Sequence, residues 1–166
     1  MLITRGHLRD MNHEEVSGIT KYHGMSKDVI KKIPYILDNP AIIFDSFSEN
    51  NPKAVCVLSN ETDDKGRSIL IVIKPDVSGR YNNIKIDSNF ILSAYGRNGG
   101  KYFLNNLAQH SNEILFMDKK RTQELFKGER LQLPAQLKKL KFNTIIHKSR
   151  NVVNTFSEIF LYGFKL

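Results

Sequence analysis

Several features are scarce in this chain of 166 residues, and each scarcity excludes a class of protein. With one cysteine, Cys56, the chain cannot form an internal disulfide, and its apolar neighbours predict a buried free thiol. No apolar run approaches the roughly 20 residues that a membrane span needs, and the first residues lack the apolar segment of a signal peptide. We therefore expect no membrane partner and a location in the cytoplasm.

The sequence also lacks the common signatures of metal and nucleotide chemistry. The stretch His13-Glu14-Glu15 has no second histidine four residues on, and no other group of carboxylates, cysteines and histidines has metal-ligand spacing. There is no glycine-rich nucleotide loop after a first strand and no Gly-x-Ser-x-Gly elbow. We therefore expect neither a metal ion nor a cofactor.

The chain has an excess of positive charge, with a net charge of +8. The segment from Lys119 to Arg150 holds ten Lys or Arg and two Glu, whereas the remainder is balanced with 15 of each sign. A local basic field favours a polyanionic partner and fast, salt-sensitive association. A solvated surface without a partner explains the same excess equally well.

The apolar spacing predicts short helices followed by strands. In the first 40 residues Thr4 and Ser26 are suitable N-caps, and Pro34 divides the second helical pattern in two. Strands are expected at 41–44, 55–58, 69–73, 84–97, 114–116 and 142–150, with helices after Gly99-Gly100 and after Asp118. A turn is expected at Ser78-Gly79. Because Ile69 to Ile73 is apolar on both faces, it should be a central strand covered on each side.

These patterns predict one α+β domain spanning 1–166. Its parts would be an N-terminal helical part (1–40), a mainly antiparallel sheet with inserted helices (41–151) and an apolar tail (152–166).

Two rows of polar side chains end otherwise apolar strands. In an extended chain Ser93, Tyr95 and Arg97 share a face. A hydroxyl, a phenol and a guanidinium in one row can bind a phosphate. His147 and Ser149 form the second row. The alternative for the first row is a strand that runs into the following turn, where Ser93, Tyr95 and Arg97 face water.

The remaining polar inventory suits RNA cleavage without a metal ion. A base removes the proton of the ribose 2′-hydroxyl, an acid protonates the departing 5′-oxygen, and cations stabilise the charged phosphorane. Histidine is the natural acid and base near neutral pH, and Lys or Arg supplies the electrostatic stabilisation. Lys74, at the end of the central strand, is a candidate cation, although such a lysine more often extends to solvent.

An ordered series of short stretches carries a resemblance to a known family. They are Ile3 to Asp10, His23-Gly24-Met25-Ser26, Ile33 to Ser46, Ile86 to Arg97 and Phe142 to Ser149. Over residues 3 to about 154 the chain resembles the toxin-like C-terminal domains of phage MuF-type head proteins and related mobile-element polyproteins, a group placed in the barnase, EndoU, colicin and RelE-like superfamily of metal-independent ribonucleases.

The resemblance implies an α+β fold whose antiparallel sheet presents the active site on one face. It implies His23 and His147 as the acid and base, and Ser93, Tyr95 and Arg97 as the groups that bind the phosphate. Lys74 and Ser149 are secondary candidates. The implied partners are an RNA substrate, a cognate immunity protein and a parent phage or mobile-element polyprotein that delivers the domain into a target cell. The basic excess of the last third adds Lys119, Lys120 and Arg121 as candidates for binding the substrate.

Two other functions fit the same sequence. One is a non-catalytic nucleic-acid-binding module of a phage or mobile-element protein that uses the basic last third as a phosphate clamp. The other is a toxin domain of different chemistry, such as ADP-ribosylation, against which the lack of a late Glu-x-Glu pair counts.

Overall fold

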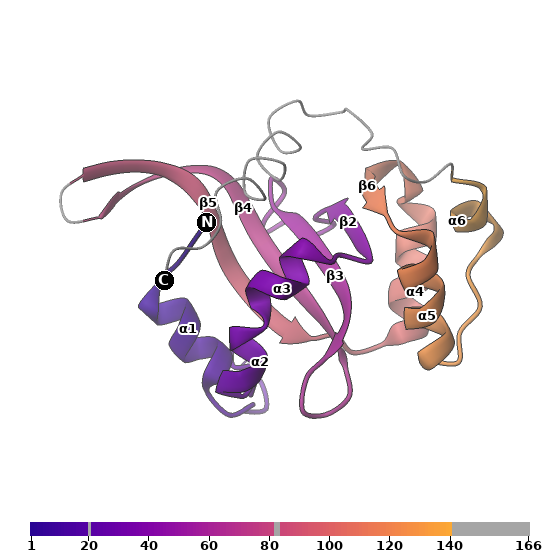
Figure 1. The fold of residues 1–166 in the computed structure, drawn as a ribbon, viewed down its shortest axis with the longest axis horizontal. Helices are drawn as coiled ribbons and strands as arrows, with labels where there is room; N and C mark the ends of the chain where they lie inside the picture. The colour runs from indigo at the N-terminus through magenta and orange to yellow at the C-terminus, as the bar shows by residue number, and fades with distance from the viewer. Residues whose placement is uncertain (20, 82–83, 141–166) are drawn as a thin grey trace.

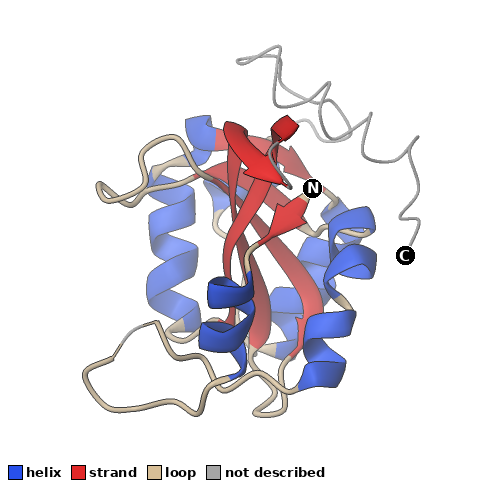
Figure 2. Cartoon of the chain, turned by 90° about the vertical axis from the view of Figure 1, so that its left-hand side faces the viewer, coloured by secondary structure: helices blue, strands red, loops and turns tan. Residues whose placement is uncertain are grey.

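A six-stranded sheet organises the molecule, with helices on both of its faces (Figures 1 and 2). The computed structural model describes residues 1–19, 21–81 and 84–140. The strands are β1 (Leu2–Ile3), β2 (Ile42–Asp45), β3 (Val55–Thr62), β4 (Ser68–Tyr81), β5 (Ile84–Gly96) and β6 (Ile114–Met117), in the order β1-β5-β4-β3-β2-β6. The helices are α1 (Arg5–Asn12), α2 (Lys27–Lys31), α3 (Ile33–Asp38), α4 (Gly100–Gln109), α5 (Lys119–Gly128) and α6 (Ala135–Lys139), with a 3₁₀ turn at Ser111–Glu113.

The predicted fold class, α+β with a mainly antiparallel sheet, is confirmed. Strands β2 to β6 pair only in antiparallel fashion within the described residues. The sequence did not indicate β1, which pairs in parallel with β5 through Leu2 opposite Phe90. A strand of two residues has too short a pattern to be read, and its pairing joins segments far apart in the chain.

The expected helix starts are present. Thr4 Oγ1 accepts a hydrogen bond from the backbone N–H of His7, and Ser26 Oγ accepts one from Val29. Asp118 caps α5 in the same way. Each such cap contributes about 1 kcal/mol by satisfying an N–H that has no partner within its helix. Pro34 lies in the first turn of α3, where its missing N–H costs nothing.

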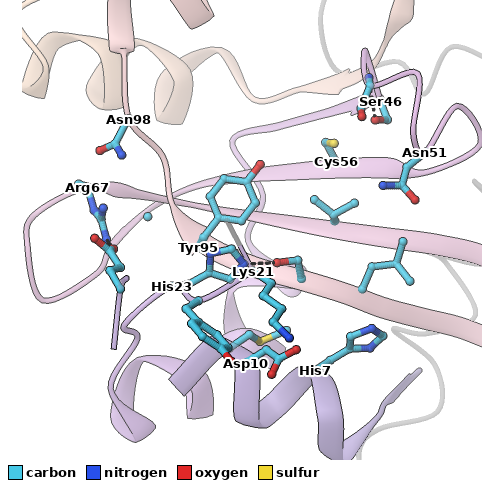
Figure 3. A pocket seen from close by; sticks show the side chains of 18 of the residues that line it. His7, Asp10, Lys21, His23, Ser46, Asn51, Cys56, Arg67, Tyr95 and Asn98 are labelled. Carbon is cyan, nitrogen blue, oxygen red and sulfur yellow. Dashed lines mark hydrogen bonds and ion pairs between the residues drawn. The ribbon is translucent and has the colours of Figure 1, made fainter. Parts of the chain in front are cut away.

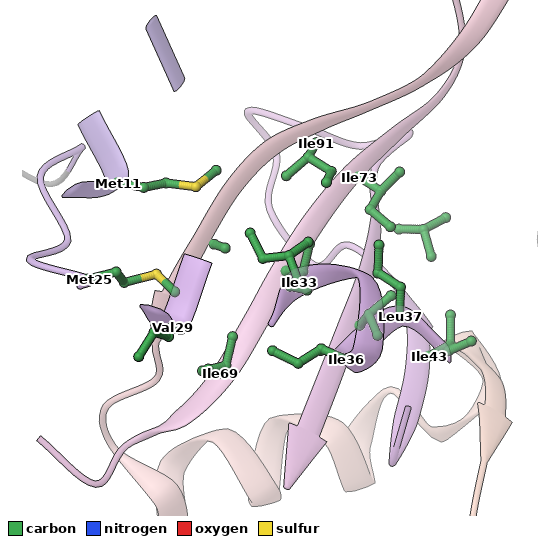
Figure 4. Packing of buried hydrophobic residues seen from close by; sticks show 14 of the residues in the cluster. Met11, Met25, Val29, Ile33, Ile36, Leu37, Ile43, Ile69, Ile73 and Ile91 are labelled. Carbon is green, nitrogen blue, oxygen red and sulfur yellow. The ribbon is translucent and has the colours of Figure 1, made fainter. Parts of the chain in front are cut away.

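The core has two layers, one on each face of the sheet, as the apolar run of the central strand predicted. On one face Ile69, Ile71 and Ile73 of β4 pack with α1, α2 and α3 (Figure 4). On the other face Leu70 packs in a second cluster that includes residues of α4, α5 and α6. Full burial of one such side chain contributes about 1.5–3 kcal/mol, so β4 ties both layers together.

The hairpin of β4 and β5 is longer than expected and extends as a curved ribbon (Figure 1). The turn expected at Ser78-Gly79 is wrong, because these residues continue β4 and pair with Asp87 and Ile86. The register shifts between Lys74 and Val77. There Asp76 has φ 51°, and its N–H donates to Asn89 Oδ1 at 3.1 Å. The irregularity absorbs Pro75, which lacks a backbone N–H, so the strand continues through it.

The strand expected at 142–150 and the tail at 152–166 lie outside the described residues. Within the described part of the chain, none of the helices is long and apolar enough to cross a bilayer.

Candidate functional site

A pocket of about 870 Å³ opens on one face of the sheet (Figure 3). Its floor includes Cys56 of β3, Val72 of β4 and Ser93 of β5. These three residues are direct cross-strand neighbours, because Cys56 pairs with Val72 and Val72 pairs with Ser93. Three adjacent strands therefore supply a continuous floor that is apolar on one side and polar at Ser93.

A bulge in β5 positions the polar end of this floor. Val72 pairs with Ser93, but the next residue, Ile73, pairs with Ile91, so Leu92 is an extra residue in β5. An extra residue changes which face the following side chains point to. As a result Ile91 and Ala94 both belong to the core layer of α1 to α3, while Leu92 and Ser93 line the pocket.

His23 meets Ser93 and Tyr95 over this floor. Its Nε2 lies 2.8 Å from Ser93 Oγ, and its ring centre lies 5.0 Å from that of Tyr95. The donor in the first contact depends on which ring nitrogen carries the proton. Partial burial lowers the pKa of His23 below its usual 6.5, and burial raises the pKa of Tyr95. Near neutral pH the site therefore combines a neutral imidazole with two intact hydroxyl groups.

The loop that carries His23 is fastened to α1. The backbone N–H groups of His23, Gly24 and Met25 donate to the carbonyls of Asp10, His13 and Met11, at 3.4, 2.8 and 2.9 Å. Gly24 has φ 61°, a conformation that glycine adopts without strain. Met25 is 1 % exposed and packs with Met11 in the core, so its side chain anchors the end of the loop.

Ionic contacts fasten the same loop to the β3–β4 turn. Glu15 accepts from Arg67 and, at 2.7 Å, from Lys65. Ser26 Oγ and Asp64 Oδ1 are 3.2 Å apart. The hydrogen bonds from Arg67 and Lys65 lower the pKa of Glu15 to about 2, so its carboxylate is charged throughout the physiological range.

Arg67 connects this network to the pocket wall. Its Nε donates to Asp63 Oδ2 at 2.7 Å, and the Asp63 carboxylate, 3 % exposed, also accepts from the N–H groups of Lys65 and Arg67 in the turn. Arg67 lines the pocket, but two carboxylates, Glu15 and Asp63, balance its charge.

Three further polar side chains line the pocket beside His23. His7 and Asp10 extend from α1, and Lys21 extends from the loop (Figure 3). The Nδ1 atom of His7 is buried and has no hydrogen-bond partner among the described residues. The ammonium of Lys21 lies 5.1 Å from the centre of the Tyr22 ring and forms no ion pair with the described part of the chain. Lys21 is therefore a cation available to an anionic ligand.

Of the row predicted from β5, Ser93 and Tyr95 line the pocket and Arg97 does not. Arg97 follows the end of the strand at Gly96, is 6 % exposed and pairs with Glu129. Its guanidinium carbon lies 4.5 Å from the ring centre of Phe103 in α4. The structure therefore does not bring Arg97 together with Ser93 and Tyr95, because α4 and the end of α5 enclose the side chain.

The remaining predicted residues lie elsewhere. Lys74 is exposed on β4 and does not line the pocket. Lys119, Lys120 and Arg121 form the first turn of α5, away from the pocket lining, and Arg121 donates to Asn39 Oδ1 at 2.8 Å. His147 and Ser149 fall outside the described residues, so their predicted roles stay predictions.

Three residues that line the pocket, His7, Lys21 and Arg67, were not predicted from the sequence. Lys21 is two residues from His23 in the chain, and His7 lies in the first turn of α1, so position in sequence offered a weak signal for both. Nothing in the sequence marked Arg67, because its place depends on how the β3–β4 turn meets the loop of Glu15. In the described ranges no three His, Cys, Asp or Glu side chains form a group that could hold a metal ion.

The fold and pocket define an α+β domain with a histidine–hydroxyl site on its sheet. A family profile described as the phage MuF C-terminal domain matches residues 16–124, and the chain belongs to this family. The match includes His23, Arg67, Ser93 and Tyr95, and ends before the last strand that the sequence predicts. Comparison with curated proteins and comparison with solved structures gave no match.

Proposed function

We propose that this domain is a metal-independent endoribonuclease of the barnase, EndoU, colicin and RelE-like superfamily, acting as a toxin domain. The contact between His23 Nε2 and Ser93 Oγ in a pocket on the sheet is the observation that carries the proposal. It holds a neutral imidazole, which is a base at physiological pH, against the wall of a pocket large enough for more than one nucleotide.

In the proposed reaction the nucleophile belongs to the RNA. His23 takes the proton of a ribose 2′-hydroxyl, and the 2′-oxygen attacks the adjacent phosphorus. The bond from phosphorus to the 5′-oxygen breaks, and a second side chain, acting as the acid, protonates that oxygen. The products are a 2′,3′-cyclic phosphate and a free 5′-hydroxyl. His7 lines the described pocket and supplies a candidate acid, in addition to the predicted His147.

The charge that develops on the phosphorane needs cations and hydrogen-bond donors. Lys21 is unpaired within the described residues and lines the pocket, and the Tyr95 hydroxyl stays protonated because burial raises its pKa. In the proposal these two groups contact the phosphate in place of Arg97, and the exposed Lys119 and Lys120 attract the RNA from outside the pocket.

Metal removal tests this proposal. We expect the purified domain to cut bacterial RNA in excess EDTA at the same rate as without it. The fragments should carry 2′,3′-cyclic phosphate ends, which block ligation until mild acid opens the ring and a phosphatase removes the resulting monophosphate. The measurement is gel analysis of RNA fragments together with end-group analysis. RNA binding without fragments would favour the non-catalytic binding module, and cleavage abolished by EDTA would contradict a metal-independent reaction.

The pH dependence of cleavage provides a second prediction. Burial disfavours the charged imidazole and places the pKa of His23 below 6.5, so the neutral base persists to lower pH than for a free histidine. On the acidic side of the profile, activity should therefore rise with pH and reach half its maximum at a pH below 6.5, before deprotonation of the acid lowers it again at higher pH. The measurement is kcat/KM for a short fluorescent RNA between pH 4.5 and 8; an acidic midpoint above 6.5 would contradict His23 as the base.

A ribonuclease of this kind would damage the cell that makes it. We propose that its producer also carries a cognate immunity protein and that a parent phage or mobile-element polyprotein delivers the domain. Family membership supports the phage association.

A further inference from the structure

The pocket extends to both sides of the His23–Ser93 pair. In Figure 3 Arg67 and Asn98 lie on one side of Tyr95 and His23, whereas Ser46, Asn51 and Cys56 lie on the other. The two sides differ in charge. The first contains a guanidinium, and the second is lined by the hydroxyls of Ser46 and Ser48 and the carboxamide of Asn51. Glu49, the charged residue of the 46–51 loop, is exposed and does not line the pocket.

The 46–51 loop is held in one shape. Backbone hydrogen bonds join Ser46 to Ala54, Asn51 to Ser48 and Ala54 to Asn51, at 2.8, 3.0 and 3.1 Å. The Ser48 N–H donates to Ser46 Oγ at 3.2 Å. A loop fixed in this way loses little conformational entropy when it binds a ligand.

An aromatic side chain anchors the same loop from outside the pocket. The ring of Phe47 stacks on Phe44 of β2 at 5.0 Å and on His110 at 4.7 Å. Phe47 thereby fills the space against the helix layer, and its neighbours Ser46 and Ser48 both line the pocket. The anchor and the pocket-lining groups are thus adjacent in the chain.

The polar groups of the loop have unused hydrogen-bonding capacity. Among the described residues neither the Asn51 side chain nor the Ser48 hydroxyl makes a side-chain hydrogen bond. A carboxamide offers a donor and an acceptor side by side, which is the pattern along the edge of a nucleobase. Beneath the loop, Val72 and the thiol of Cys56 give an uncharged floor, since burial raises the pKa of Cys56 to about 12.

We propose that the 46–51 loop binds the nucleobase next to the scissile phosphate through Asn51 and Ser48, and that it sets the base preference of cleavage. The inference rests on the proposed ribonuclease activity and identifies the part of the pocket that reads the substrate. The base lies with its face over Cys56 and Val72 and its edge towards the loop, while the phosphate lies at His23, Ser93 and Lys21. A phosphate is a poor fit for the loop side because no cation of the loop lines it.

Sequencing of cleavage ends tests this assignment. The intact protein is given a pool of RNA with randomised sequence, and the bases flanking each cut are counted. We expect a preference at one flanking position, reduced about tenfold in Asn51→Ala and in Ser48→Ala, because a site built to hydrogen-bond a base discriminates by that contact. Asn50→Ala is the matched control, since Asn50 is the exposed neighbour and does not line the pocket; it should keep the preference.

The outcomes separate the two proposals. If the intact protein cuts RNA but Asn51→Ala and Ser48→Ala retain its base preference, or if it has no preference, the assignment of the loop is overturned while the ribonuclease stands. If the intact protein does not cut RNA, the ribonuclease itself fails. Melting temperatures of the three variants within a few degrees of the intact protein would show that any lost preference reflects the site rather than unfolding.

Discussion

Replacing His23 with alanine should lower the rate of RNA cleavage by about 10³-fold, within the range found when a general base is removed. The imidazole is the group that lies against Ser93 in the pocket, at 2.8 Å, and alanine leaves no base in its place. The measurement is the initial rate of cleavage of a short fluorescent RNA in EDTA. His13→Ala is the matched control, because His13 is exposed in the same loop and does not line the pocket; it should change the rate by less than about threefold.

Ser93→Ala distinguishes the proposed reaction from one in which serine is the nucleophile. If RNA supplies its own 2′-hydroxyl, Ser93 only orients His23 and the loss should be about tenfold, the value of one hydrogen bond to a charged or reacting group. If Ser93 attacked the substrate, its loss would match that of His23. A His23→Ala protein that cuts RNA at the intact rate would contradict the assignment of the base.

The acid is assigned by a parallel comparison of His7→Ala and His147→Ala. In the proposed reaction one of these two histidines donates a proton to the leaving 5′-oxygen. The variant that lacks this acid should cut RNA about 10²-fold more slowly or worse, and the other variant should keep most of its rate. An RNA with a 5′-sulfur leaving group, which needs no proton, should restore cleavage selectively in the variant that lacks the acid.

Replacing Glu129 with alanine should destabilise the fold by about 3–5 kcal/mol, because it leaves the buried cation of Arg97 without its partner. The Arg97 side chain is 4 % exposed, and its Nε and Nη1 atoms already lack partners among the described residues. Glu129 therefore supplies the carboxylate contact of this guanidinium and also accepts from Ser68 Oγ at 3.1 Å. Urea unfolding followed by circular dichroism measures the loss.

Two variants control for this effect. Glu124→Ala removes an exposed carboxylate from α5, the helix that ends just before Glu129, and should change stability by less than about 0.5 kcal/mol. The double variant Arg97→Met, Glu129→Ala removes both charges and should recover much of the lost stability, since an apolar replacement of a buried ion pair is often neutral or favourable. A Glu129→Ala protein as stable as Glu124→Ala would show that the buried ion pair contributes nothing.

The parts of the fold that depend on neighbouring residues were readable from the sequence. The caps at Thr4 and Ser26, the break at Pro34 and the two-sided burial of Ile69 to Ile73 all follow from local spacing. The turn expected at Ser78-Gly79 failed because pairing with β5 outweighs the local preference of serine and glycine for turns.

The site was only partly readable, because its geometry depends on contacts between distant segments. Ser93 and Tyr95 were found from alternation along β5, and His23 from the family resemblance, but no local pattern brings His23 to Ser93. Arg97 was misplaced because the alternation was extended one step past Gly96, where the strand ends. Arg67 was missed because its role depends on Glu15, 52 positions away.

The separation between His23 and Ser93 also has a consequence for how the chain is made. These residues lie 70 positions apart, and β1 pairs with β5 across a longer separation, with Leu2 opposite Phe90. Closing so long a loop has an entropic cost that is recovered only when the contacts at both ends form together. During synthesis from the N-terminus, the segment with His23 must wait until β5 has emerged from the ribosome. A ribosome-bound chain that ends before β5 therefore has no assembled site. If the domain is a ribonuclease, such a chain should not cut the RNA around it.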